Sequence, residues 1–157
     1  MAESYFRKAV ETLTERNPNP YDGEPYYNLG WSCMMQQKWD EAYDAFFKSA
    51  WNAAWQDAAY YALAQLDTRK GKYESALDKI DRSLIRNWHN HKARQLKISI
   101  LRKLGRKEEA LALVAESLQI DRFNMGCRFE HYLLTRDVEV LEEMKKLMRG
   151  WAHGYIE

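Results

Sequence analysis

Few residues in this sequence have the types and the spacing that catalysis or metal binding requires. His89 and His91 flank one residue, but a zinc site takes three or four protein ligands, and His131 and His153 are distant in sequence. Neither a GxGxxG nor a GxxxxGK[ST] phosphate loop is present. We therefore expect no metal, no cofactor and no phosphate-loop chemistry, and we interpret His89 and His91 as polar residues of a turn.

Neighbouring carboxylates offer acid–base chemistry in principle. The pairs are Asp40 with Glu41, Glu108 with Glu109, and Glu142 with Glu143. Each pair stands early in an amphipathic pattern, where negative charge stabilises the positive end of the helix dipole. Since this explanation needs no substrate, we predict that the chain is not an enzyme.

The composition is that of an ordinary globular chain, with 46% hydrophobic and 30% charged residues and a formal net charge of +1. Cys33 and Cys127 are too few for a disulfide framework, and we interpret them as buried thiols of a reducing compartment. No run reaches the ~18 apolar residues of a membrane span, and the N-terminus lacks the layout of a signal peptide. The expected location is the cytoplasm, and neither a membrane nor nucleic acid is the expected main partner.

Apolar residues recur three and four positions apart along most of the chain, which is the period of an α-helix. Leu111, Val114 and Leu118 form one such stripe. Alternating runs of β-branched residues are missing, and all three prolines precede residue 26. The sequence therefore predicts an all-α fold, in which Gly71 and Gly105 mark helix ends.

A step of 34 residues superposes chemically similar residues in three segments. The first copy has Tyr26, Leu29, Gly30, Ala42, Phe46 and Ser49, and the second has Tyr60, Leu63, Ala64, Ala76, Ile80 and Ser83. In the third copy Arg94, Lys97 and Ile98 replace the aromatic residue, the leucine and the glycine, whereas Ala110, Val114 and Ser117 keep the pattern. Because small residues let paired helices approach closely, we expect Gly30 to face Ala42 and Ala64 to face Ala76.

This period and order of residues resemble the tetratricopeptide repeat (TPR). The usual proline after the second helix is replaced by Ala54, Trp88 and Arg122. The resemblance implies an all-α, right-handed α-solenoid of antiparallel helical pairs with a 34-residue period. Because each end of the chain lacks a complete repeat, we expect the chain to be a segment of a longer protein, and the resemblance implies a multidomain bacterial protein.

We expect one solenoid over residues 1–157. It has an N-terminal helix or half repeat at 2–16, with Phe6, Val10 and Leu13 on one side. Repeats follow at 23–56, 57–90 and 91–124, with helices at 24–37, 40–53, 57–70, 74–87, 91–104 and 107–120. A shortened repeat at 125–150, with helices at 124–135 and 138–150, precedes a tail or truncated helix at 151–157.

In the TPR family the first helices of the pairs line a concave groove that usually holds an extended peptide or a partner helix. The resemblance assigns groove positions that are aromatic and rich in methionine at one end and basic at the other. They are Tyr27, Asn28, Trp31, Met34, Met35, Tyr61, Gln65, Arg69, Lys92, Gln95, Ser99, Arg102 and Lys103. The expected ligand is a peptide with an apolar part and an acidic part, since Arg69 and Arg102 suit a carboxylate. An alternative is that the rings pack against the N-terminal helix and the segment at 17–25, which contains Pro18 and Pro20.

One well-defined kind of TPR groove is not expected. Receptors of heat-shock chaperone tails hold the terminal carboxylates with Lys, Asn, Asn, Lys and Arg. The matching positions here are Tyr27, Trp31, Ala62, Lys92 and Leu96. Only Lys92 agrees with that pattern, which disfavours a chaperone-tail receptor.

The stretch from Trp88 to Lys107 contains no acidic residue and several cations. One interpretation is a solvated helix face that acidic residues of the following helix balance. The other is a surface for an anion or RNA, whose binding would weaken steeply with salt.

Three functions are thus open. The first is a non-catalytic protein–protein interaction module with a peptide in its groove. The second is a structural spacer or assembly segment of a larger, possibly enzymatic, protein, which would self-associate through its terminal helices. The third is the anion or RNA surface of the third repeat.

Overall fold

The computed structural model describes residues 2–16 and 22–152 of the chain. All regular structure in these residues is helical, as the sequence predicts. The chain divides into two compact units, Met1–His89 and Asn90–Glu157. The predicted packing of the Leu13 side chain, the cover expected from Pro18 and Pro20, and the tail at 153–157 lie outside the described residues.

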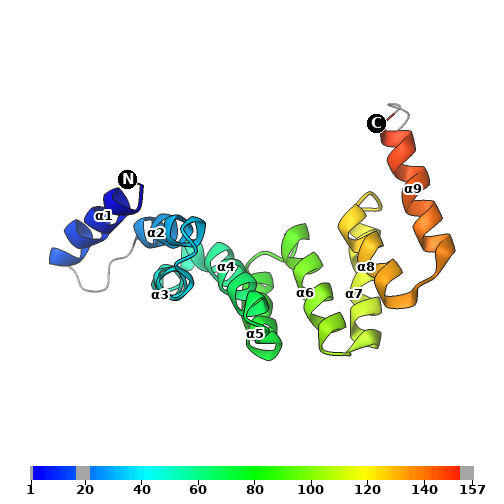
Figure 1. The fold of residues 1–157 in the computed structure, drawn as a ribbon, viewed down its shortest axis with the longest axis horizontal. Helices are drawn as coiled ribbons and strands as arrows, with labels where there is room; N and C mark the ends of the chain where they lie inside the picture. The colour runs from blue at the N-terminus through cyan, green and yellow to red at the C-terminus, as the bar shows by residue number, and fades with distance from the viewer. Residues whose placement is uncertain (1, 17–21, 153–157) are drawn as a thin grey trace. The chain divides into compact units, whose positions relative to one another are not determined.

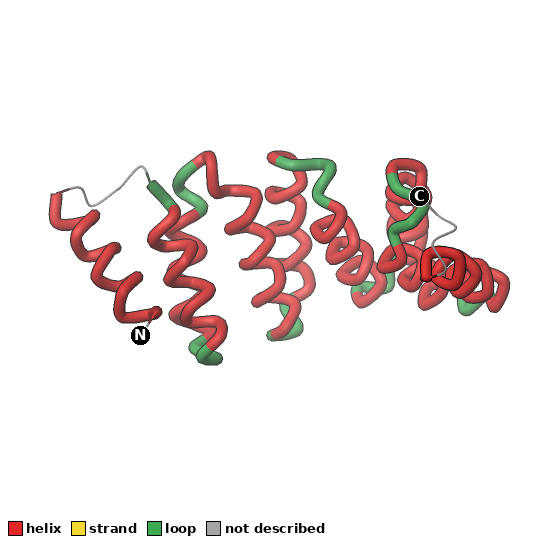
Figure 2. Tube along the Cα trace, turned by 90° about the horizontal axis from the view of Figure 1, so that it is seen from above, coloured by secondary structure: helices red, strands yellow, loops and turns green. Residues whose placement is uncertain are grey.

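The first unit holds an N-terminal helix and two helical pairs (Figure 1). Helix α1 (Ala2–Arg16) packs against α2 (Glu24–Met35), which pairs with α3 (Trp39–Ser49). A short 3-10 helix, η1 (Ala53–Trp55), leads into α4 (Gln56–Arg69), which pairs with α5 (Tyr73–Arg86). From α2 to α5 the connections alternate between the two ends of the helices, so that neighbours are antiparallel (Figure 2).

The second unit repeats the arrangement with α6 (His91–Lys103) and α7 (Lys107–Ile120), followed by α8 (Met125–Thr135) and α9 (Val138–Ala152). Helix α8 packs against both α6 and α7. Asn90 and Asn124 cap α6 and α8, because their side-chain oxygens accept bonds from the amides of Ala93 and Cys127. The predicted helix at 40–53 is too long, since α3 ends at Ser49 and a 3-10 turn follows.

Acidic residues stand in the first turn of several helices, where the helix dipole favours them. Asp40 and Glu41 begin α3, and Glu108 and Glu109 begin α7, as expected. In α9 the first-turn acid is Glu139, so the pair at 142–143 lies one turn further into the helix than the prediction placed it.

The turns inside the three repeats share one backbone conformation. Gly71 and Gly105 both have φ of 75°, a left-handed conformation that glycine adopts without steric cost. Gln37, 34 residues before Gly71, takes the same conformation with φ of 61°. The backbone of this turn is therefore repeated even where the glycine is not.

A core cluster joins α2, α3 and α4 of the first unit. Fully buried Phe46 fills the space that Gly30 leaves, since a Cβ added at Gly30 would lie 2.6 Å from the Phe46 ring. The three atoms nearest to a Cβ added at Gly30 all belong to Phe46, whereas the approach of Gly30 to Ala42 stays a prediction. The next repeat has Ala64 and Ile80 at these two positions and the third has Ile98 and Val114, so a larger residue on the first helix goes with a smaller one on the second.

The serines of the repeat do more than supply a small side chain. The Ser49 hydroxyl donates to the carbonyl oxygen of Gly23 at 2.9 Å, and the Ser83 hydroxyl donates to that of Asp57 at 2.7 Å. Each bond ties the end of a second helix to the start of its partner. Ser117 is equally buried, but its hydroxyl makes no such bond to a backbone carbonyl and lies beside the Cys127 thiol instead.

Candidate functional site

The aromatic residues of α2 that were predicted for the groove, Tyr27 and Trp31, pack against the core cluster. The Tyr27 and Trp31 rings each meet the Phe46 ring edge to face, with centroids 5.6 Å apart. Tyr27 also lies 4.9 Å from Trp55, which precedes α4. Such contacts fix both rings before any ligand arrives, and fixed aromatic rings are typical of binding hot spots.

The other predicted residues of α2 differ in exposure. Met34 packs partly against the core cluster, and Asn28 is half-buried. Met35 is 82% exposed, although it is a large apolar side chain. Together with the ring of Trp31 one turn earlier, Met35 gives α2 an adaptable apolar surface.

Helix α4 places Tyr61, Gln65 and Arg69 one turn apart, on one face. Burial raises the pKa of the Tyr61 hydroxyl above its usual value of 10. The Oε1 atom of Gln65 has no hydrogen-bond partner among the described residues. The Arg69 guanidinium lies 4.0 Å from the centre of the Trp39 ring, a cation–π contact that orients it.

The predicted residues of α6 belong to the second unit, and two of them engage α8. The Arg102 Nε atom donates to Glu130 of α8 at 2.7 Å, and Glu130 is buried. The Gln95 amide covers Gly126, where an added Cβ would lie 2.1 Å from its Oε1 atom. Lys92 and Lys103 are exposed and Ser99 is half-buried.

These contacts also bear on the basic stretch of the third repeat. Arg102 is neutralised by Glu130, and Arg106 pairs with Glu109 in the first turn of α7. The second pair matches the interpretation that acidic residues of the following helix balance the cations. Paired cations attract a phosphate backbone less than free ones do, which weighs against an RNA surface.

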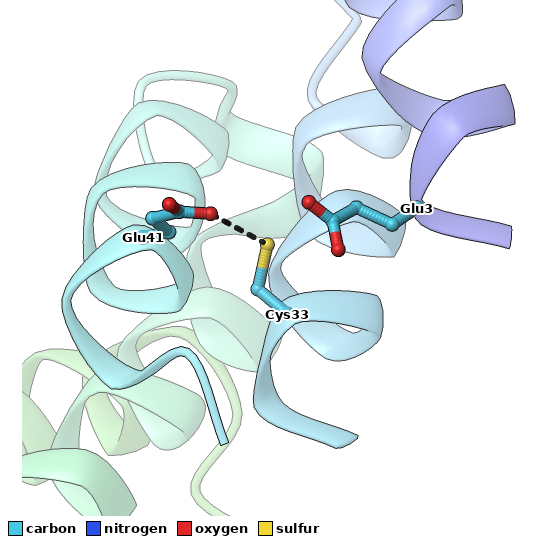
Figure 3. Close-up of side chains that lie close together, drawn as sticks. All are labelled: Glu3, Cys33 and Glu41. Atoms are coloured by element: carbon cyan, nitrogen blue, oxygen red, sulfur yellow. Dashed lines mark hydrogen bonds between the residues drawn. The ribbon is translucent and has the colours of Figure 1, made fainter. Parts of the chain in front are cut away.

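Three potential metal ligands converge where α1, α2 and α3 meet. The Glu3 and Glu41 carboxylates point toward the Cys33 thiol from either side (Figure 3), and the ligand atoms all lie within 4.8 Å of one another. Two cations occupy the same place. Lys38 donates to both Glu3 oxygens at 3.1 and 2.9 Å, and Arg7 bonds Glu3 and Glu41.

These ion pairs connect α1 to the helical pair of α2 and α3. The Lys38 ammonium, followed by the Arg7 guanidinium, lowers the pKa of Glu3 to about 2. Burial raises the pKa of the Cys33 thiol, which disfavours the thiolate that metals bind. A metal ion would have to displace both cations, so the geometry favours an ion-pair cluster over a metal centre.

A cavity is lined by residues of α1, α2 and α3, none of which was predicted for the groove. It has a volume of about 380 Å³ and an apolar floor that includes Tyr26 and Leu29. Arg7, Glu41 and Lys48 stand among its charged residues. Since Arg7 and Glu41 bind each other, this cavity shares its wall with the ion-pair cluster.

No protein-family model matches the sequence, and no curated protein matches it either. Solved structures do match. The crystal structure of MamA aligns at 16% identity over 96% of this chain and 89% of its own, with a TM-score of 0.77. YrrB, a TPR protein with an unusual peptide-binding site, aligns at 21% identity over 88% and 69%, with a TM-score of 0.69. The first TPR of Spaghetti (RPAP3), bound to the HSP90 peptide SRMEEVD, aligns at 18% over 83% and 94%, with a TM-score of 0.59.

The chain has the tetratricopeptide-repeat fold. The predicted resemblance and the all-α class of stacked helical pairs are thereby confirmed. The repeat boundaries and the groove residues remain predictions, because similarity at this level of identity establishes the fold alone. Among the described residues, no helix has both the length and the apolar character that crossing a membrane requires.

Two arrangements of charged residues in this chain were not predicted from the sequence. One is the ion-pair cluster, for which the 34-residue spacing of Arg7 and Glu41 was an available signal, since equivalent positions of successive repeats lie side by side. The other is the burial of Arg94. It stands at the position of Tyr26 and Tyr60, so the repeat itself marks it as an inward-facing residue.

Proposed function

We propose that the face formed by α2 and α4 binds an extended peptide segment of a protein partner, and that the chain acts as a non-catalytic interaction module. The observation that carries the proposal is an exposed apolar side chain, Met35, beside rings that the core already fixes. Exposed apolar surface next to rigid aromatic rings binds with little loss of conformational entropy.

The chemistry of the face specifies the ligand. Trp31 and Met35 suit an apolar side chain, whereas Arg69, held over Trp39, suits a carboxylate. Tyr61, which is half-buried, adds a hydroxyl that can bond a peptide backbone, whereas the Gln65 Oε1 atom is buried. The expected motif is therefore an apolar residue followed or preceded by an acidic one.

The similar structures support this use of the fold, since YrrB has a peptide-binding site and the RPAP3 repeat holds an HSP90 peptide. The ligand of this chain should nevertheless differ from a chaperone tail. Ala62 is fully buried at one of the clamp positions, and aromatic residues fill two others.

The test is a peptide-library selection on the immobilised protein, with counter-selection against Met35→Asp. Met35→Asp leaves the core intact because the side chain is 82% exposed. Ile85→Asp is the matched control, since Ile85 is an apolar residue of α5 that is 81% exposed. Selected peptides should lose at least about tenfold in affinity with Met35→Asp and keep their affinity with Ile85→Asp.

Two further variants divide the ligand into its parts. Trp31→Ala should weaken every selected peptide, whereas Arg69→Glu should weaken only the acidic ones. Affinity that is equal for the wild type and Met35→Asp would place binding on another surface. If the selection enriches no motif, the spacer or assembly function is favoured, and sedimentation should then show self-association that rises with concentration.

A further inference from the structure

Arg94 of α6 is the largest fully buried side chain among the described residues. Its Nη2 group bonds the Nδ1 atom of His91 at 2.7 Å, but Nε and Nη1 have no hydrogen-bond partner in the described part of the chain. An arginine cannot shed its proton in a protein, so this charge remains when the side chain is buried. A buried guanidinium with unmet donors is strongly unfavourable unless a negative group compensates it.

The other repeats show how unusual this position is. Tyr26 and Tyr60 occupy it in the first two repeats, where Lys48 and Arg82 lie 5.8 and 5.7 Å from the ring centres. An aromatic ring there needs no counter-charge. In the third repeat the buried residue is itself the cation, Arg94, and no ring is present at this position.

The next repeat also has an arginine here, and that one is satisfied. Arg128 donates from Nε to the carbonyl oxygen of Arg122 at 2.7 Å, and its Nη1 lies 3.5 Å from a Glu143 oxygen. Arg94 has neither a carbonyl nor a carboxylate. The nearby carboxylate of Glu130 is bound by Arg102 at 2.7 Å, and Asp121 accepts from the Phe123 amide at 3.0 Å.

The start of α6 adds positive potential at the same place. Helices α6 and α8 carry no acidic residue in the first turn, unlike α2, α3, α4, α5 and α7, and α6 begins with His91 and Lys92. The bond to His91 shows that the Arg94 head turns back toward this first turn. The first amides of a helix and its dipole attract anions.

We propose that Arg94 and the first turn of α6 bind a small inorganic anion, either chloride or an oxyanion such as phosphate. The anion is the counter-charge of the buried guanidinium. It must be small and must enter through local opening of the structure, since the Arg94 side chain has no exposed surface. The site is independent of the peptide face in the first unit.

The test measures melting temperature against anion concentration at constant pH and ionic strength, with gluconate as the replacing anion. Chloride and phosphate are varied in separate series. A ligand that binds only the folded state should raise the melting temperature by roughly 3–5 °C per tenfold increase above its dissociation constant. A rise with chloride alone assigns chloride, and a rise with phosphate assigns the oxyanion.

Arg94→Tyr is the decisive variant, because it restores the residue of the first two repeats and removes the charge. Its melting temperature should not depend on the anion beyond the general salting effect that both proteins share. Arg102→Met is the control, since Arg102 already has Glu130 as its counter-charge, and it should keep the wild-type slope. Equal slopes in the wild type and Arg94→Tyr would overturn the proposal.

A bromide soak of crystals locates the anion directly. An anomalous peak within about 3.5 Å of Arg94 Nε or Nη1 is the expected result, which corresponds to contact between an anion and an N–H donor. Equal slopes together with an ordered water at that place would assign water as the partner of Arg94 and reject the anion.

Discussion

Gly30→Ala tests the packing on which the peptide face rests. The added Cβ would lie 2.6, 2.7 and 2.8 Å from three atoms of the Phe46 ring, closer than any van der Waals contact. Phe46 cannot swing out of the way freely, because it is fully buried and meets the Tyr27 and Trp31 rings. The substitution should therefore disturb stability and the binding face together.

Two opposing effects set the magnitude. Overpacking a core costs about 1–3 kcal/mol, and replacing a glycine inside a helix by alanine gains about 1 kcal/mol in helix propensity. The expected net effect of Gly30→Ala is a loss of about 1 kcal/mol. Phe46→Ile alone should cost about 2 kcal/mol, because the smaller side chain leaves a cavity beside the glycine.

The double variant Gly30→Ala, Phe46→Ile reproduces the pair Ala64 and Ile80 of the second repeat. The alanine methyl should fill part of that cavity, so the double variant should be more stable than the sum of the single changes by about 1–2 kcal/mol. Urea unfolding followed by circular dichroism measures all four proteins. If Gly30→Ala is more stable than the wild type and the two changes in unfolding free energy are additive, a Cβ at Gly30 does not collide with the Phe46 ring, and the packing explanation is wrong.

Three further predictions concern single interactions. The bond to Lys38 lowers the pKa of Glu3 to about 2, so the ionised carboxylate stabilises the fold fully above the ordinary pKa of 4.5, and this contribution should vanish as pH falls from 4.5 toward 2. The difference in urea midpoint between the wild type and Glu3→Gln should therefore shrink with falling pH, and a difference that stays constant contradicts this prediction. Ser83→Ala should cost about 1 kcal/mol, because it breaks the bond to the Asp57 carbonyl oxygen. Ser117→Ala removes no bond to a carbonyl, only a weak contact with the Cys127 thiol, so it should change stability by less than about 0.5 kcal/mol, and thermal unfolding of both variants compares them. Gln37→Gly should raise stability by roughly 0.5 kcal/mol, because φ of 61° strains any residue with a Cβ, and an unchanged melting curve would deny that strain.

The sequence predicts the helices well because one period carries several kinds of information. Gly105 and Ala110 mark a turn and a close contact at the same time, so the two signals agree on the start of α7. The end of α3 was placed four residues too late, since apolar Trp51 and Ala53 continue the helical pattern while the backbone has already turned. A periodic pattern shows which face is apolar, but a helix end depends on local backbone bonds.

Charged contacts were harder to predict than apolar ones for a physical reason. Burial of an apolar residue depends only on its face, which the period gives. The period assigns Arg102 to a face of α6, but the pairing of Arg102 with Glu130 depends on the rotamers of both side chains and on the spacing of α6 and α8. The Glu3 and Lys38 bond depends in the same way on how α1 docks. The sequence thus assigns positions to the candidate site, and these stay predictions, whereas it does not show which of their charges are paired.

A comparison of the repeats distinguishes positions that packing constrains from positions that are free to change their chemistry. The pair of positions where the two helices of a repeat meet changes in size and in a compensating way, as Gly30 with Phe46 and Ala64 with Ile80 show. At the position of Trp31, in contrast, the second repeat has Gln65, a polar group whose size bears no relation to the core beneath. Packing does not require that change, since a solenoid needs only matching interfaces between neighbouring helices. A groove residue that changes its chemistry from repeat to repeat gives each stretch of a bound peptide a different environment, and so it can fix the direction and register in which the peptide binds.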